Sequence, residues 1–153
     1  MTSSSLIGAD AMDLRTLRPE DYDAIVSVWE GAALPYKPKG RDSRSEVKRQ
    51  MAVDPEMWLG CFIAGKLVGV VVGTYESRKG WLNRLAVVPE HQGKGCAKAL
   101  VNEMESRLRA RGLGIFAVLI EEGHDASLAL FKGSGYEEHE SIHYLRKRDS
   151  PDI

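Results

Sequence analysis

The segment from Val87 to Leu100, VVPEHQGKGCAKAL, holds the residues of this chain best suited to binding chemistry. A run of strand formers leads into Gly93 and Gly95, and a helical pattern begins directly after them. Unpaired backbone N–H groups gather at such a helix start, at the positive end of the helix dipole. Glycines let a ligand approach that backbone closely. The segment therefore predicts a phosphate site, to which Lys94 and Lys98 add positive charge.

Two common phosphate-binding motifs do not explain this segment. The chain contains neither a GxGxxG fingerprint nor the G-x-x-x-x-G-K-[ST] pattern of a Walker loop at this position. The strands that precede the segment also read as an antiparallel meander, which suits neither of those folds. Neither motif therefore accounts for the predicted phosphate site.

The cysteines and histidines do not form a disulfide framework or a metal site. Cys61 and Cys96 are isolated from one another in the sequence, which fits a reducing compartment, so we expect a cytoplasmic protein. The four histidines never combine with the cysteines at the spacing of a zinc site, and no metal is expected. Two roles are considered for Cys96 inside the glycine turn, a reactive thiol and a small residue packed under the turn.

Length and charge indicate one globular domain. The chain has 153 residues, a formal net charge of −1 and 43% hydrophobic residues, so neither nucleic acid nor a membrane surface is an expected partner. No apolar run approaches the roughly 18 residues of a membrane span. We expect a disordered tail at residues 1–11, one domain at residues 12–148 and a short tail at residues 149–153.

Apolar periodicity and turn residues predict the elements that position the glycine turn. In chain order they are a strand at residues 13–18, a helix at 19–31, a short helix at 43–53, two strands about a turn at Gly65-Lys66, a strand at 81–89, a helix from Ala97 to about Gly112, a strand at 115–120, a helix at 125–132 and a strand at 142–146. Ser43 is the predicted N-cap of the short helix, and Glu46 completes a capping box. The continuous apolar run IFAVLI indicates a strand buried on both faces. Residues 81–120 therefore read as a βαβ unit with parallel strands.

At this point the residues resemble the GCN5-related N-acetyltransferase (GNAT) family. The family pattern, Gln or Arg, two residues, Gly, one residue, then Gly or Ala, stands here as Gln92-Gly93-Lys94-Gly95-Cys96-Ala97. LAVVPE lies directly upstream, HDASLALFKGSGYEE resembles the second family helix, and LRTLRPEDYDAI is similar to the usual opening. The resemblance covers about residues 13–147.

The resemblance implies the fold class α/β (α+β). It implies a mixed, mainly antiparallel twisted sheet of six to seven strands, with a central parallel, splayed pair and about four flanking helices. It also implies that acetyl-CoA is the cosubstrate, with its pyrophosphate on the glycine turn and its pantetheine arm along the upstream strand. The implied cofactor-binding residues are Leu85, Ala86, Val87, Gln92, Gly93, Lys94, Gly95, Cys96, Ala97, Lys98 and Phe131.

The proton-handling residues of the family pattern are replaced here. Many members have a tyrosine acid where this chain has Phe131, an asparagine where it has His124 and a glutamate where it has Leu119. Only a neutral amine attacks a thioester, so a base is required. Glu76 at a strand end and His124 near the splayed strands are the candidate bases. The alternatives are a solvated carboxylate for Glu76 and a helix-capping or packed imidazole for His124. Tyr136 and Tyr144 are considered as substitute acids, and no acid is assigned.

The resemblance leaves the acceptor and the assembly open. The expected reaction is direct transfer of an acetyl group to a primary amine, on a protein N-terminus, a lysine or a small molecule; the alternative is a non-catalytic acyl-CoA-binding or sensing module. The first inter-helix loop carries four basic residues, Lys37, Lys39, Arg41 and Arg44. Their charges either bind an acceptor that carries an acidic group or are simply solvated. A homodimer through the apolar residues of IHYL is also left open.

Overall fold

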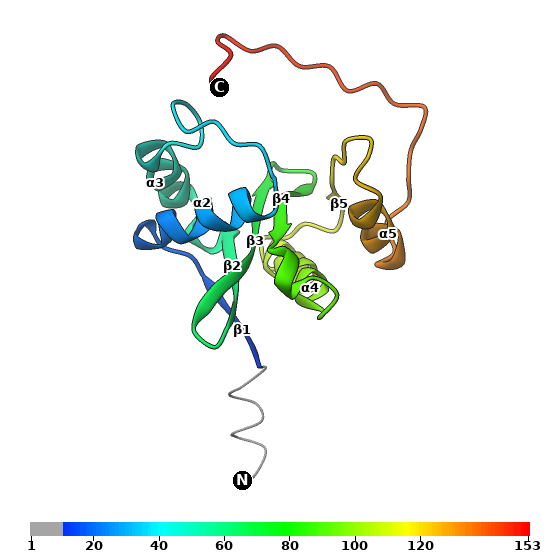
Figure 1. The fold of residues 1–153 in the computed structure, drawn as a ribbon. Helices are drawn as coiled ribbons and strands as arrows, with labels where there is room; N and C mark the ends of the chain where they lie inside the picture. Colours follow the sequence, from blue (N-terminus) through cyan, green and yellow to red (C-terminus); the bar gives the residue numbers. More distant parts are fainter. Residues whose placement is uncertain (1–10) are drawn as a thin grey trace.

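The computed structural model describes residues 11–153, so the predicted N-terminal tail lies outside the described residues except for Ala11. Five strands form one mixed sheet in the order β1-β2-β3-β4-β5 (Figure 1). The strands are β1 (Met12–Thr16), β2 (Trp58–Ile63), β3 (Lys66–Tyr75), β4 (Gly80–Val87) and β5 (Phe116–Ala117). Strands β1 to β4 pair with one another in antiparallel fashion, and β5 runs parallel to β4.

Over residues 11–153, four α-helices and three 3-10 turns accompany the sheet. The helices are α2 (Tyr22–Gly31), α3 (Arg44–Val53), α4 (Cys96–Ala110) and α5 (Asp125–Gly133), and the turns are η1 (Pro19–Asp21), η2 (Pro55–Met57) and η3 (Pro89–His91). Pro19 and the acids after it form η1 rather than the first turn of α2. Ser43 caps α3 as predicted, because its hydroxyl accepts a hydrogen bond from Glu46 N–H.

The helices α2 and α4 cover opposite faces of the sheet. Trp58, the neighbour of Val72 in the sheet, packs against Trp29 of α2, with the two ring centres 6.4 Å apart. The next residue, Gly73, faces Met104 of α4, and a Cβ added at Gly73 would lie 2.5 Å from the Met104 sulfur. Successive strand residues point to opposite faces, so a two-sided core results. This core fixes β4 from both sides and leaves only its edge free.

The predicted terminal strand at residues 142–146 is wrong, since those residues form no strand, and the sheet has five strands rather than six or seven. β5 is also shorter than predicted, because only Phe116 and Ala117 pair with β4. Ile115 and Leu119 are more than half exposed, so the apolar run IFAVLI is not buried on both faces. Because β5 has only two residues, its outer edge offers the C-terminal segment few backbone groups to pair with.

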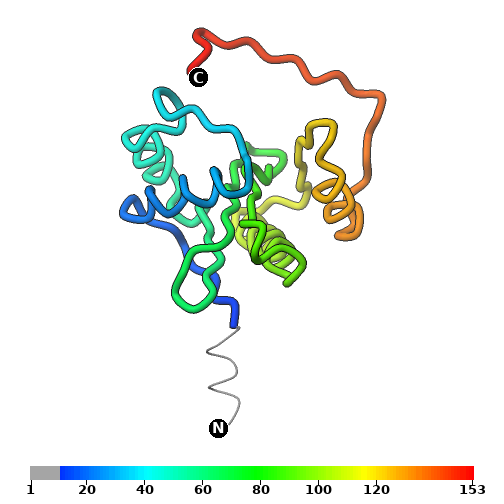
Figure 2. The backbone as a smooth tube through the Cα atoms, viewed as in Figure 1, coloured from blue at the N-terminus to red at the C-terminus, as the bar shows by residue number. Residues whose placement is uncertain are grey.

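The C-terminal segment instead crosses one end of the molecule. Figures 1 and 2 show it running from α5 as an extended chain to the loop between α2 and α3. Asp152 C=O there accepts a hydrogen bond from Arg41 N–H at 3.3 Å. Arg146 and Arg148 of this segment line the same cavity as residues Leu82 to Leu85 of β4.

Candidate active site

The glycine turn before α4 has the geometry of an anion site. Gly93 and Gly95 adopt φ angles of +77° and +89°, and Gly95 is the N-cap of α4 without a side-chain cap. Such left-handed angles strain any residue that carries a Cβ. Among the described residues, the N–H groups of residues 93–98 donate to no backbone or side-chain acceptor. These N–H groups and the helix dipole together favour a phosphate.

The predicted side chains around this turn take different positions. Lys94 and Lys98 are exposed beside the turn, where they add positive charge. Gln92 Nε2 donates to Val87 C=O at 3.0 Å, so its side chain ties the turn to the end of β4. Cys96 and Cys61 are both buried. Burial of Cys61, together with its hydrogen bond to Cys96, raises the pKa of Cys61 to about 12. The two thiols therefore pack as small core residues.

The edge of β4 that faces β5 is free beyond its first two residues. The parallel pairing stops at Trp81 and Ala117, as the predicted splayed pair requires. Val88 N–H donates to Val68 C=O on the β3 side. Strand backbone groups alternate in direction, so Leu85 and Val87 turn theirs toward the free edge, while Ala86 faces β3. An amide-bearing ligand can extend the sheet at the Leu85 backbone and at Val87 N–H, while Val87 C=O already accepts from Gln92 Nε2.

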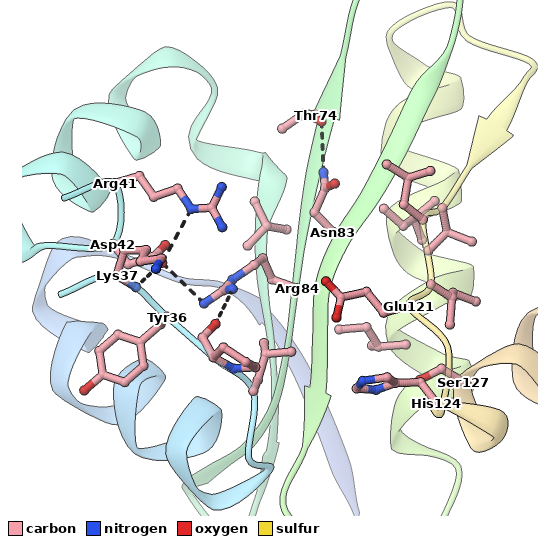
Figure 3. Close-up of a pocket in the computed structure, with 18 of the residues that line it drawn as sticks. Tyr36, Lys37, Arg41, Asp42, Thr74, Asn83, Arg84, Glu121, His124 and Ser127 are labelled. Carbon is pink, nitrogen blue, oxygen red and sulfur yellow. Dashed lines mark hydrogen bonds and ion pairs between the residues drawn. The ribbon is translucent and has the colours of Figure 1, made fainter. Parts of the chain in front are cut away.

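A cavity of about 790 Å³ lies between the parted strands (Figure 3). We call it the β4 cavity. One wall is β4 from Leu82 to Leu85, the second is the chain from Val118 to Glu121 with His124, Ser127 and Phe131, and the third is the α2–α3 loop; Arg146 and Arg148 of the C-terminal segment complete it. The predicted site residues Leu85, His124 and Phe131 therefore line one space.

A bulge in β4 carries Arg84, a residue of the β4 cavity with a left-handed backbone conformation. Arg84 has φ +57°, at the position where the β3–β4 register shifts. Its guanidinium lies 4.3 Å from the centre of the Trp29 ring and donates from Nη1 to Pro35 C=O at 2.7 Å. Its Nη2 lies 3.6 Å from Asp42 Oδ2, and burial lowers the pKa of Arg84. Arg84 thus holds the α2–α3 loop against the sheet.

The pairing of Arg84 with Asp42 at the site was not predicted from the sequence. Asp42 is only 6% exposed, and its carboxylate also accepts a hydrogen bond from Lys37 N–H at 2.8 Å. The available signal was the polar pair Asn83-Arg84, which interrupts the apolar strand WLNRLAVV. Polar residues inside a central strand of this kind often mark a bulge or a ligand site.

The two candidate bases differ in position. His124, at the N-cap of α5, lines the β4 cavity together with Glu121, which the sequence analysis did not single out. Glu76 lies outside the cavity, in the turn after β3, where its carboxylate accepts hydrogen bonds from Arg78 N–H at 2.7 Å and Lys79 N–H at 3.3 Å. The structure therefore brings only His124 of the two to the site.

The candidate acids are not at the β4 cavity. Phe131, 2% exposed, lines its wall and has no proton to donate. The Tyr136 ring packs edge-on against Phe131, with the ring centres 5.0 Å apart, but its hydroxyl donates to Glu105 at 2.6 Å. Burial, reinforced by that hydrogen bond, raises the pKa of Tyr136. Tyr144 is 63% exposed and does not line the cavity.

The basic residues of the α2–α3 loop divide into two groups. Lys37 and Arg41 line the β4 cavity, whereas Lys39 and Arg44 do not. Arg44 instead pairs with Asp23 at 2.6 Å. Within residues 11–153, no group of three or more potential metal ligands comes together, and no helix is long and apolar enough to cross a membrane.

Comparison with known proteins agrees with this geometry. Residues 22–136 match the model of the acetyltransferase (GNAT) family. An acetyltransferase of Sodalis glossinidius (strain morsitans) is 30% identical over 137 residues, which cover 90% of this chain and 95% of that protein.

Two solved structures share the fold. The PaiA N-acetyltransferase of Thermoplasma acidophilum, solved in complex with coenzyme A, superposes with a TM-score of 0.74 at 18% identity and covers 86% of this chain and 92% of its own. The ribosomal-protein-S18-alanine N-acetyltransferase of Escherichia coli gives a TM-score of 0.67 at 21% identity, over 84% and 79% of the two chains. The family match and the bacterial relative establish that this chain belongs to the GNAT family of N-acetyltransferases, whose cosubstrate is acetyl-CoA.

Proposed function

We propose that this enzyme transfers the acetyl group of acetyl-CoA directly to a primary amine, on a protein N-terminus, a lysine side chain or a small molecule. One observation carries the proposal: the anion site at the start of α4 continues along the free edge of β4 into the β4 cavity. A pyrophosphate on the N–H groups of residues 93–98 and a pantetheine arm on Leu85 and Val87 would deliver the thioester to that cavity.

The cavity residues suit nucleophilic attack by an amine. The amine nitrogen forms a bond to the acetyl carbon, the carbon–sulfur bond breaks, and CoA leaves as a thiolate. The amine must lose two protons in all, one to become neutral and one after attack. His124 is our candidate to accept a proton, directly or through water, with Glu121 on the same wall.

The leaving group needs little help from a protein acid. An alkyl thiol has a pKa near 8.5, so a thiolate is a tolerable leaving group at mildly alkaline pH. This accounts for a working site in which Phe131 stands at the acid position and Tyr136 is bonded to Glu105. Much of the rate would come from holding the amine and the thioester together in the cavity.

The test is acetyl-CoA turnover over a panel of peptides and small amines, with CoA release followed by a thiol reagent. We expect at least one amine to be acetylated well above the uncatalysed background, with the N-acetyl product identified by mass. The same preparation is checked for acetyl-CoA binding by thermal shift, since a ligand at 100 times its dissociation constant adds about 2.7 kcal/mol. Binding without acetylation of any amine would contradict the proposal.

A further inference from the structure

The β4 cavity carries an excess of positive charge that the whole chain does not. Five cationic side chains line it, from three separate parts of the chain: Lys37, Arg41, Arg84, Arg146 and Arg148. Within residues 11–153, two anionic side chains line the cavity with them, Asp42 and Glu121, and the complete chain has a net charge of −1. The positive charge is therefore gathered at this site.

The charge is mostly available to a ligand. Asp42 is 6% exposed and is already bound by Arg84 and by Lys37 N–H, so its charge is neutralised within the protein. The Arg41 side chain is 46% exposed, and its Nε is 3.9 Å from Asp42 Oδ2. Arg146 and Arg148 form none of the ion pairs found among the described residues. The cations at the mouth of the cavity are free to attract an anion.

These cations lie apart from the phosphate site. None of residues 88–98 lines the β4 cavity, and the cations come from the α2–α3 loop, the β4 bulge and the C-terminal segment. Figure 3 shows Lys37, Arg41 and Arg84 on the wall opposite Glu121 and His124. The charge therefore faces the reacting end of the cavity, where the acceptor enters, rather than the turn that would bind the pyrophosphate.

A simple amine is a poor match for such a site. An alkylamine arrives as a cation near neutral pH, and a cationic cavity repels it. An acceptor that also carries a negative group gains from the same charges, and the arginines can bind a carboxylate through two parallel hydrogen bonds. Nearby positive charge also lowers the pKa of the bound amine and so favours its reactive neutral form.

From this arrangement we infer that the acceptor is an amine that carries a carboxylate, bound by the cations at the mouth of the β4 cavity. The inference rests on the proposed function and narrows its acceptor to this class. The carboxylate belongs either to a free amino acid or to an acidic residue of a peptide, and the experiment separates these two sources.

The experiment compares acceptors matched in all but the carboxylate. Lysine is compared with cadaverine, and peptides with aspartate or glutamate after the amine are compared with their asparagine or glutamine counterparts. We expect kcat/KM to be about tenfold higher for the carboxylate member, as for two or three exposed ion pairs. The preference shrinks from 0.01 to 0.15 M ionic strength, where the screening length falls from about 30 to about 8 Å. A preference in only one series identifies the source, and no preference in either overturns the inference.

The chain supplies matched control variants. Lys37→Gln and the double substitution Arg146→Gln, Arg148→Gln remove cavity charges, whereas Lys39→Gln and Lys147→Gln remove neighbouring charges that do not line the cavity. We expect the acceptor KM to rise about two- to fivefold per cavity charge, with little change for the controls. Equal effects in both sets, or an increase in the KM for acetyl-CoA instead, would overturn the inference.

A binding measurement separates this inference from the proposed function. Calorimetry of the CoA-saturated protein with N-acetyl amino acids and their carboxamides requires no turnover. Tighter binding of the carboxylates, lost in the cavity variants alone, supports the inference even if no amine is acetylated. Acetylation of amines without any carboxylate preference in rate or binding leaves the proposed function standing and refutes this inference.

Discussion

Arg84 Nη2 lies 3.6 Å from Asp42 Oδ2, and this contact ties the bulge of β4 to a loop more than forty positions earlier in the chain. The same guanidinium donates to Pro35 C=O at 2.7 Å and lies over the Trp29 ring. One side chain therefore holds the strand, the loop and α2 together at one wall of the β4 cavity.

Replacing Arg84 with methionine should lower both stability and acceptor binding. The change keeps the packing on Trp29 but leaves the buried Asp42 carboxylate with fewer partners, which costs about 1 to 3 kcal/mol of unfolding free energy. We expect the acceptor KM to rise while the KM for acetyl-CoA stays within about twofold, because the phosphate turn is untouched. Urea unfolding and steady-state kinetics measure the two effects.

The double substitution Arg84→Met, Asp42→Asn is the control. It removes the unpaired charge, so its stability should be higher than the sum of the two single effects predicts. Additive losses would show that the Arg84–Asp42 contact contributes nothing.

Gly93→Ala should weaken acetyl-CoA binding about tenfold, which is about 1.4 kcal/mol. The φ of +77° strains an alanine, and relief of that strain would turn the neighbouring N–H groups away from the phosphate. The measurement is acetyl-CoA affinity by calorimetry.

Gly112→Ala is matched to this variant. Gly112 has φ +86° and an equally open Cβ position, but it follows the far end of α4. Both variants should lose similar stability, and only Gly93→Ala should lose affinity. A similar loss of acetyl-CoA affinity in both variants would refute the assignment of the Gly93 turn as the phosphate site.

His124→Gln should lower kcat about a hundredfold, as loss of a general base does. Steady-state kinetics with an amine acceptor measure kcat for each variant. Glu76→Gln, which alters a turn outside the β4 cavity, should leave kcat within about twofold. If Glu121→Gln rather than His124→Gln abolishes turnover, the assignment of the base to His124 is wrong.

Stability should decline in acid through Asp54. Arg111 donates to both of its oxygens at 2.8 Å, and this pairing lowers the pKa of Asp54 to about 2 from its usual 3.8. A lowered carboxyl pKa stabilises the folded state above the unfolded pKa, and the stabilisation is lost as pH falls from about 4.5 toward 2. The shift corresponds to about 2 kcal/mol.

Asp54→Asn should therefore be less stable at pH 7 by about that amount and should lose less stability between pH 4.5 and 2 than the wild type. Urea denaturation across this pH range measures both slopes. Some acid dependence will remain in the variant, because Arg15 likewise lowers the pKa of Asp21. Parallel slopes for the variant and the wild type would contradict the assignment to Asp54.

The local features of this protein could be predicted from the sequence, because they depend on residues that are close together along the chain. Gly93 and Gly95 before a helical pattern predicted a tight turn into α4, since only glycine adopts such backbone angles freely, and anion binding by this turn stays a prediction. Ser43 three residues before Glu46 predicted the cap of α3. The apolar periods of α2 and α4, and the parallel pairing across α4, were likewise confirmed.

Only the tertiary structure decided which distant residues meet. Whether the apolar residues 115–120 and 142–146 become strands depends on pairing with distant segments, and only Phe116 and Ala117 of these residues pair with another strand. The folded chain brings Arg84 into contact with Asp42 and lets the Tyr136 hydroxyl donate to Glu105. It also places Glu76 in a turn outside the β4 cavity. The gathering of Lys37, Arg84 and Arg148 around one cavity is likewise invisible to spacing, because charges from separate segments share a site only after the chain has folded.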